Sequence, residues 1–567
     1  MVPTAQSPKP AKASNALQIW ELVRYLFRYG RVMHGPVLPL AIAASISRAG
    51  LIFSINEVAT RQQQGWQPFA LLALSVVSTL GFSHFGRIYK RRLTETIQRD
   101  LRVNLTRLLL EADVDFLQQR DHGQVYSVVV RETGTVAESA VRVIGTLESL
   151  LLLAVCAPYL FWLSWVTGLA TVVAVSIGAV GFFLTDKPAR FYVRRAVKAT
   201  GDFCDRVNDV LGGWMELRLN RRRRDDLEED ARRLADGALR NSVAAERLFS
   251  LGETLTQTSM IGLLCAVVVV LPLIHGGGTA TMFQVLTLVL FTSGPIETVF
   301  GDLPRLSRAA ASKRVIDELE QALVAGRSPA GAAHAPNPGF RSIELRGVTA
   351  VLGEENAAQS DDSFHLGPID LTFRPGETVF ICGGNGSGKT TLLSLITGLR
   401  APDSGEILLD GEPLRAEDRS RFRSLFSAVF AQFHLFRKYY GLTPEEKRAL
   451  DGHIGEFALA GRVRMLEEEF STLSLSTGQK RRLALAVALA ESRPIIVLDE
   501  FAADQDPARR AWFYDVLVPR MAAAGHLVLV VTHDEHRFHQ CDRLIRMETG
   551  RVVSDTRVDP GRLRLAE

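Results

Sequence analysis

Six long apolar runs fill most of the first 300 residues of this 567-residue chain, and they constrain its fold more than any other feature. A helix needs about 20 mostly apolar residues to cross a bilayer. The runs that meet this need are Pro36–Val58, Pro68–Phe85, Val143–Leu163, Trp165–Leu184, Glu253–Ile274 and Thr281–Phe300. One such run could be a buried helix of a soluble protein, but six in about 270 residues cannot share one soluble core. We therefore predict an α-helical transmembrane domain of six helices over residues 34–325.

The basic residues between these runs predict the orientation of the helices. Residues 87–141 contain nine Lys or Arg and residues 186–248 contain fifteen, whereas the three other loops hold one, Arg61. Positive residues are retained on the cytoplasmic side of a membrane. We therefore expect both long loops, both termini and a short N-terminal segment (residues 1–33) on the cytoplasmic side of the membrane. The pattern of the long loops predicts helical extensions of the spans, joined by short turns that can dock on another domain.

One basic run, RLNRRRRDDLEEDARRL (residues 218–234), could be taken for a nucleic-acid site. Acidic residues interleave with the basic ones, and the run lies between two predicted spans, so we predict a solvated, ion-paired helix and no nucleic-acid partner. The five cysteines have no paired spacing and predict neither a disulfide framework nor a metal site.

Three ionisable residues, Arg48, Glu148 and Glu297, fall within or near the predicted spans. Charged groups in lipid are expensive and usually face a cavity or a partner charge. These residues are therefore candidates for a polar substrate pathway. The alternative, that they form structural pairs or lie one turn outside the spans, stays open at this point.

The second half of the chain has the composition of a soluble α/β domain. Residues 326–342 are rich in Gly, Ala and Pro and are predicted to be a linker. The strand-like IELRGVTAV then opens a domain that we place at residues 343–567.

Within this domain, GGNGSGKT (residues 383–390) follows a strand-like segment and precedes a helical one, which is the context of a phosphate-binding loop. Lys389 should reach the β- and γ-phosphates of a nucleotide, and Thr390 should bind Mg²⁺.

A second acidic motif belongs with this loop. PIIVLDE (residues 494–500) is a buried strand that ends in two carboxylates. We expect Asp499 to hold Mg²⁺ through water and Glu500 to orient or deprotonate the water that attacks the nucleotide.

Four further segments resemble the ABC ATPase family. LSTGQ (residues 475–479) resembles the signature that distinguishes ABC ATPases from other phosphate-loop proteins. Gln432 resembles the glutamine of the Q-loop, Asp506 the aspartate of the D-loop, and His533 the switch histidine. The resemblance implies an α/β P-loop ABC ATPase domain fused to the six helices. The implied catalytic residues are Glu500, His533, Lys389 and Gln432, with Mg²⁺ bound by Thr390, Gln432 and Asp499. The implied ATP contacts are Gly383, Gly384, Asn385, Gly386, Ser387, Gly388, Lys389, Thr390, Thr391, Ser476, Gly478, Gln479 and Asp506.

The whole chain resembles exporter-type ABC half-transporters, in which six spans precede one ATPase domain. Segments such as LFSAVFAQFHLF and LDEFAADQDP resemble the bacterial branch that exports cyclic peptides, lasso peptides and pyoverdine precursors. The implied function is ATP-driven export of a peptide-like solute across the inner membrane of a bacterium. A lipid flippase, an exporter-fold siderophore importer and a non-transporting regulatory membrane ATPase remain as alternatives. In this family each ATP lies between the phosphate loop of one domain and the signature of another, so the resemblance also implies a homodimer in the lipid bilayer.

The sequence departs from the family pattern in two places. Many relatives have an aromatic residue that stacks on adenine at the end of the first strand, where this chain has Ala350 and Leu352. Phe364 or His365, after a polar insertion, are the candidate substitutes. The third signature residue is Thr477, where glycine is commoner.

Overall fold

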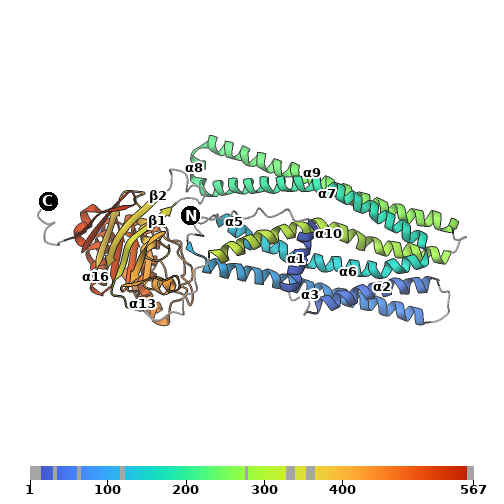
Figure 1. The fold of residues 1–567 in the computed structure, drawn as a ribbon, viewed down its shortest axis with the longest axis horizontal. Coiled ribbons are helices and arrows are strands. Elements are labelled where there is room, and N and C mark those ends of the chain that lie inside the picture. Colours follow the sequence, from blue (N-terminus) through green and yellow to red (C-terminus); the bar gives the residue numbers. More distant parts are fainter. Residues whose placement is uncertain are drawn as a thin grey trace. The chain divides into compact units, whose positions relative to one another are not determined.

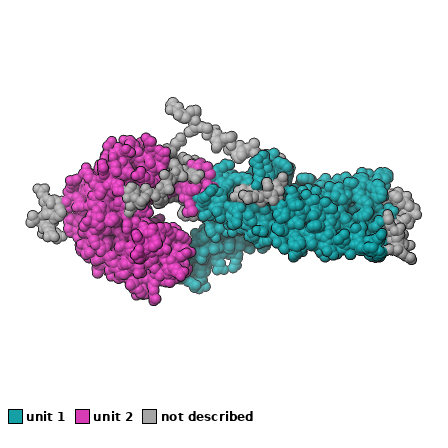
Figure 2. Space-filling model, turned by 90° about the horizontal axis from the view of Figure 1, so that it is seen from below, with its two compact units in different colours: residues 1–107, 123–321 teal, residues 108–122, 322–567 magenta. Residues whose placement is uncertain are grey.

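The computed structural model describes residues 15–29, 35–60, 66–114, 116, 122–274, 279–326, 339–352 and 364–558. Most of the predicted linker and the polar insertion before Phe364 lie outside these residues. The chain divides into two compact units (Figure 2). The membrane unit comprises residues 1–107 and 123–321, and the ATPase unit comprises residues 108–122 and 322–567.

Among the described residues of the membrane unit, six helices are long and apolar enough to cross a membrane, which confirms the predicted architecture. They are α2 (Val37–Thr60), α3 (Gln67–Glu111), α6 (Thr133–Leu163), α7 (Trp165–Gly212), α9 (Arg221–Ile274) and α10 (Thr279–Ala325). Shorter elements accompany them: α1 (Asn15–Tyr29), α5 (His122–Ser127), η2 (Val128–Glu132) and α8 (Trp214–Leu219). Five of the six long helices continue well beyond their apolar runs, as the sequence of the loops predicts.

Local sequence explains where these helices turn. Ser164 alone separates α6 from α7: its backbone is extended, and its side chain accepts a hydrogen bond from the N–H of Thr167 at 3.3 Å. Helices α7 and α9 run side by side and are joined by α8 (Figure 1). The basic run forms the start of α9, with ion pairs between Arg221 and Asp225 (3.7 Å) and between Arg232 and Glu228 (3.3 Å).

The membrane unit has an apolar core and an apolar exterior. The core joins α2, α6, α7, α9 and α10 through buried residues such as Leu152, Met260 and Leu288. Large apolar side chains such as Leu80 and Leu184 point outward and are exposed. A soluble protein rarely exposes such a surface, whereas a bilayer solvates it.

The described part of the ATPase unit contains two sheets. The first has strand order β2-β1-β4-β5 and is antiparallel, and the second has strand order β10-β9-β3-β8-β7-β6. The strands are β1 (Ile343–Leu352), β2 (Phe364–Phe373), β3 (Thr378–Gly383), β4 (Ser404–Leu409), β5 (Glu412–Pro413), β6 (Phe426–Val429), β7 (Ile495–Asp499), β8 (Leu527–Val531), β9 (Arg543–Glu548) and β10 (Arg551–Arg557). The helices are α11 (Lys389–Ile396), η3 (Ala416–Asp418), α12 (Arg419–Arg423), α13 (Pro444–Glu456), α14 (Thr477–Ala490), η4 (Phe501–Asp504), α15 (Pro507–Trp512), η5 (Phe513–Leu517), α16 (Val518–Ala523) and η6 (Glu535–Gln540).

The second sheet is parallel except at β10, and its central strands are buried on both faces. Strands β7 and β8 are buried at every residue, as continuous apolar runs in a covered parallel sheet must be. Successive side chains of β3 enter two different cores: Phe380 packs toward the side of α13 and α14, and Ile381 packs toward α11 and the first sheet. Packing on both sides of β3 therefore fixes where this strand ends and the phosphate loop begins.

Candidate active site

The segments predicted to bind and cleave ATP lie at one edge of the second sheet. Strands β3, β8, β7 and β6 are neighbours and parallel, with Ile381 beside Val531 and Val531 beside Asp499. The phosphate loop follows β3, Gln432 follows β6, Glu500 follows β7 and His533 follows β8. Ligands of open parallel sheets bind outside the carboxyl ends of the strands. The fold thus brings four separate motifs to one place.

The phosphate loop is shaped by its glycines and its lysine. Gly388 has φ of +96°, and a Cβ there would lie 2.6 Å from the side chain of Leu366, so glycine is required. Lys389 begins α11, and its Nζ donates to the carbonyl oxygens of Gly383 and Gly384, each at 2.9 Å. These bonds hold the lysine across the loop at the amino end of a helix, where anions bind well.

The residues present fit an Mg²⁺–nucleotide complex. Gly384 to Gly386 and Thr390 are exposed, whereas the Oγ of Ser387 is buried and makes no hydrogen bond to any described residue. Within the described residues, no group of three or more His, Cys, Asp or Glu side chains could hold a metal ion by itself. Mg²⁺ at nucleotide sites commonly takes one or two protein ligands together with phosphate oxygens and water. Thr390, Gln432 and Asp499, the ligands expected from the sequence, follow or end strands β3, β6 and β7 at this edge.

Asp499 is almost fully buried, with 1% of its surface exposed. Burial raises the pKa of its carboxyl group, and the negative charge of Glu500 adds to that, while a hydrogen bond from the backbone N–H of Ala431 and the charge of Lys389 oppose it. The Ala431 bond measures 3.3 Å. It ties the segment that carries the exposed Gln432 to the end of β7. A bound Mg²⁺ would favour the ionised form of Asp499 further.

Glu500 and His533 lie together. The Oε1 of Glu500 is 3.2 Å from the Nε2 of His533, and both side chains are partly exposed. A carboxylate here can accept a proton from water, and an imidazole can donate a hydrogen bond to a phosphate oxygen. Glu500 has φ of +52°, which is uncommon for a residue with a side chain.

Tyr514 positions the residues on both sides of His533, a role that no sequence pattern indicates. Its hydroxyl hydrogen-bonds to the Oγ1 of Thr532 at 2.6 Å and donates to the Oδ2 of Asp534 at 2.9 Å. The ring is fully buried, and burial raises the pKa of its hydroxyl, so this group stays a neutral donor. The histidine loop is therefore fixed from within the core.

The signature begins α14. Ser476 is its N-cap: the Ser476 side chain accepts from the N–H of Gln479 at 3.4 Å, and the Gln479 side chain accepts from the N–H of Ser476 at 3.0 Å. A Cβ on Gly478 would lie 2.5 Å from the carbonyl oxygen of Asp504, so the signature packs directly on the D-loop. Asp506 caps α15 through the N–H of Arg509 at 3.0 Å. Across the described residues, no hydrogen bond or ion pair joins the signature to the phosphate loop of the same chain.

The candidates for adenine stacking differ in their surroundings. Ala350 is buried in the core and cannot reach a ligand. Leu352 pairs with Phe364 at the ends of β1 and β2. A Cβ on Gly388 would lie 3.0 Å from the ring of Phe364, so this ring lies against the phosphate loop. His365 is the next residue on β2 and is exposed.

The three candidate residues of the substrate pathway have different partners in the membrane unit. Glu148 of α6 forms an ion pair with Lys90 of α3 at 2.6 Å. Arg48 of α2 is half-buried, and its Nη2 donates to the Oγ of Ser83 at 3.4 Å. Glu297 of α10 is exposed and has no ion-pair partner among the residues that the structure describes.

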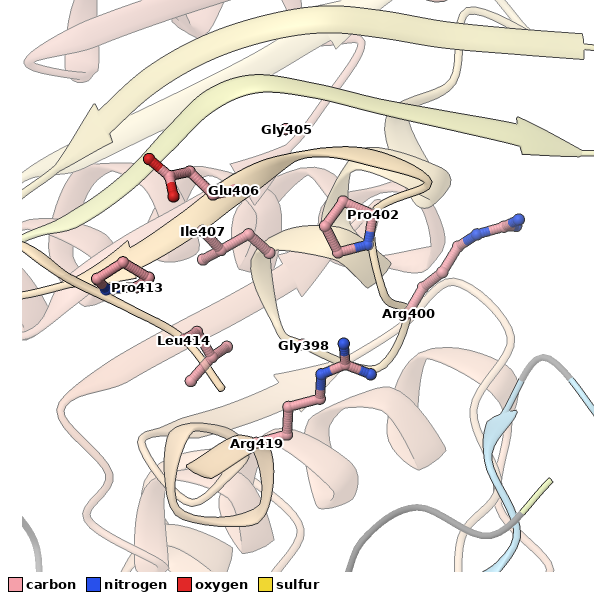
Figure 3. Close-up of a pocket in the computed structure, with 9 residues that line it drawn as sticks. All are labelled: Gly398, Arg400, Pro402, Gly405, Glu406, Ile407, Pro413, Leu414 and Arg419. Carbon is pink, nitrogen blue, oxygen red and sulfur yellow. The ribbon is translucent and has the colours of Figure 1, made fainter. Parts of the chain in front are cut away.

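A separate pocket of about 230 Å³ lies in the ATPase unit (Figure 3). Its lining includes Arg400 and Arg419, and Arg400 donates to the carbonyl oxygen of Val351 at 2.8 Å and lies 3.9 Å from Asp403. None of the predicted site residues lines it.

Comparison with known proteins identifies the family. Residues 47–294 match the family described as ABC transporter transmembrane region, and residues 366–503 match the family described as ABC transporter. The chain is an ABC transporter. This transporter is an ATPase coupled to transport, as the motifs predict.

Individual relatives support the same assignment. The transporter is 29% identical over 528 residues to the ATP-binding protein SyrD of Pseudomonas syringae pv. syringae, with 91% of this chain and 92% of that protein covered. It is 24% identical over 512 residues to an ATP-dependent lipid A-core flippase of Burkholderia orbicola, with coverages of 86% and 83%. Its fold is similar to that of a bacterial Atm1-family ABC exporter solved with ATP bound, with a TM-score of 0.74, 18% identity, and coverages of 98% and 97%.

Proposed function

We propose that this transporter uses ATP and Mg²⁺ to move a peptide-like solute out of the bacterial cytoplasm as a homodimer in the inner membrane. The observation that supports the energy source most directly is the convergence of the phosphate loop, Asp499, Glu500 and His533 at one sheet edge. The direction is supported by the exporter fold and by the basic loops, which favour a cytoplasmic ATPase unit.

The homodimer is supported by the layout of the nucleotide site. Each chain carries one phosphate loop and one signature, and the two make no hydrogen bond to each other among the described residues of one chain. Ser476 and Gly478 would contact the nucleotide held by Lys389 of a second copy. ATP would then join two copies, and its hydrolysis through Glu500 would release them. Catalysis would consist mainly of positioning and charge stabilisation.

The peptide-like solute is supported by the motifs shared with the peptide-exporting branch and by the membrane unit itself. A site for an amphipathic solute needs apolar walls with a few polar anchors. Glu297 is an exposed charge on an apolar helix without an ion-pair partner in the described part of the chain, which suits an anchor better than Glu148 does.

Reconstituted vesicles provide the test. ATP is added to the medium outside the vesicles, so only transporters whose ATPase units face that medium can hydrolyse it. A panel of amphipathic cyclic and linear peptides is added together with the ATP. A transported peptide should stimulate hydrolysis and accumulate in the lumen, and Glu297→Gln should lower the ratio of stimulated to basal hydrolysis. The Glu500→Gln variant is the control without turnover. Loss of a preloaded peptide from the lumen on ATP addition would show import instead.

A lipid flippase is the second candidate, because ATP-dependent lipid A-core flippases of several bacteria are similar over 75–86% of this chain. The same vesicles distinguish the two functions. Stimulation by an added glycolipid, with fluorescent lipid moving between leaflets and no response to any peptide, would favour the flippase.

A further inference from the structure

Arg481 of α14 is a buried charge to which the sequence analysis assigned no role. It lies three residues after Gly478, and only 7% of its surface is exposed. A buried guanidinium group is unfavourable unless its donors are paired. Its partners therefore indicate what the residue is for.

Those partners belong to three different segments of the nucleotide site. The Nη1 of Arg481 donates to the carbonyl oxygen of Glu500, and its Nη2 donates to the carbonyl oxygen of Ala431 at 3.2 Å. Its Nε lies 3.0 Å from the Oδ2 of Asp504. One side chain thus joins the residue proposed as the base, the residue before Gln432, and the D-loop.

The bond to Glu500 falls on a strained backbone. Glu500 has φ of +52°, a conformation that residues with side chains seldom adopt unless their surroundings fix it. Its N–H donates to the carbonyl oxygen of Val531 at 3.0 Å, and its own carbonyl accepts from Arg481. Both backbone polar groups are therefore held, and the carboxylate is directed toward His533 at 3.2 Å.

We propose that Arg481 is a positioning residue for ATP hydrolysis: it holds the backbone of Glu500 in the left-handed conformation that aims the carboxylate at the attacking water. The proposal rests on the role proposed for Glu500. The hydrogen bond to Ala431 and the ion pair with Asp504 fix the guanidinium plane, because the arginine fork can serve several acceptors at once. A lysine at this position could reach one of them only.

The first experiment compares Arg481→Met and Arg481→Lys with the wild-type transporter, each as the full chain in lipid nanodiscs. The kcat for ATP should fall about 100-fold in Arg481→Met, as expected when a catalytic group is displaced by about 1 Å. The KM for ATP should change little, because in the described part of the chain no hydrogen bond or ion pair joins Arg481 to the phosphate loop. Arg481→Lys should retain an intermediate kcat.

Arg543→Met is the matched control. Arg543 is a half-buried arginine of the ATPase unit, with bonds to Asp555 at 2.6 Å and 2.5 Å and a contact to Glu377 at 3.7 Å. Among the described residues, no hydrogen bond or ion pair joins it to a predicted site residue. Its loss should lower the melting temperature and leave the kcat of the folded transporter near wild type. An equal loss of kcat in Arg543→Met would show that removing any ion-paired arginine of the ATPase unit has this effect, and would overturn the proposal.

A double variant separates the proposal from the role of Glu500. In Glu500→Gln the base is absent, so adding Arg481→Met should change the residual single-turnover rate little. A further loss of about 100-fold would mean that Arg481 acts elsewhere, and the proposal would fail. Near wild-type hydrolysis by Glu500→Gln alone would instead refute the role of Glu500. If Arg481→Met does not reach the membrane, Arg481→Lys takes its place. The single variant and its combination with Glu500→Gln then give the same double-mutant comparison.

Discussion

Replacing Lys90 with methionine should leave the carboxylate of Glu148 without its partner inside the membrane unit. The two groups are 2.6 Å apart, and their side chains are 15% and 7% exposed. The Oγ of Ser45 donates to the backbone carbonyl of Glu148 at 3.1 Å and does not replace the lost cation. Breaking a buried ion pair by removing one partner destabilises a protein by about 3–5 kcal/mol, whereas replacing both partners with groups of similar volume is often neutral.

The assay is the fraction of detergent-solubilised transporter that stays monodisperse after heating. Lys90→Met should lower the midpoint by on the order of 10 °C, and Lys90→Met with Glu148→Gln should recover most of the loss. Arg91→Met is the control on the same helix: its pair with Glu95 is 75% and 54% exposed, so little change is expected. Wild-type stability of Lys90→Met, or a double variant weaker than the single one, would refute the reasoning. A stable double variant that no longer responds to any solute would assign the pair to the substrate pathway.

Three further predictions concern the ATPase unit. Glu500→Gln keeps the shape of the side chain and removes the base, so turnover should fall by about 10²–10⁴-fold while ATP stays bound, and rapid hydrolysis by the purified variant would contradict this. Because β1 does not end in a stacking aromatic residue, the preference for ATP over GTP should be weak or depend on Phe364 or His365. If the variant with both residues changed to alanine still binds ATP much more tightly than GTP, neither residue recognises adenine. Tyr514→Phe removes two buried hydrogen bonds and should destabilise the ATPase unit by about 2 kcal/mol, with a lower kcat because the loop of His533 loosens; unchanged melting and turnover would show that the hydroxyl contributes nothing.

A helix or strand was predictable from the sequence where the residues of that one segment carry the pattern that identifies it. The six apolar runs predict six helices, because length and apolar composition alone decide whether a helix can span a bilayer. The run PIIVLDE predicts β7 for a similar reason, since it is apolar throughout and ends in carboxylates. Parallel strands then place the residues that follow them at a common edge, so Asp499 and His533 could be expected near each other.

The remaining parts of the site depend on contacts between distant residues. Tyr514 lies 18 residues before Thr532 along the chain and meets it only through the packing of η5 against the sheet. Arg481 is part of a basic run, and its burial among Glu500, Ala431 and Asp504 has no local signature. The sequence left open whether Glu148 belongs to a polar substrate pathway or to a structural ion pair, because its partner, Lys90, is on another helix. Sequence periodicity identifies elements, but pairing of polar groups is settled by their tertiary packing.

Helices α7 and α9 reach far beyond the thickness of a bilayer. At 1.5 Å per residue, the 54 residues of α9 extend for about 80 Å, of which a membrane core of about 30 Å covers less than half. The two helices run side by side (Figure 1), and near their distal ends Arg206 of α7 lies 3.3 Å from Asp230 of α9. The pair therefore forms a lever arm: a tilt of about 5° at the membrane would swing a tip about 50 Å away through about 4 Å. Motions too small to disturb packing within the bilayer can thus become displacements as large as a side chain at the far end.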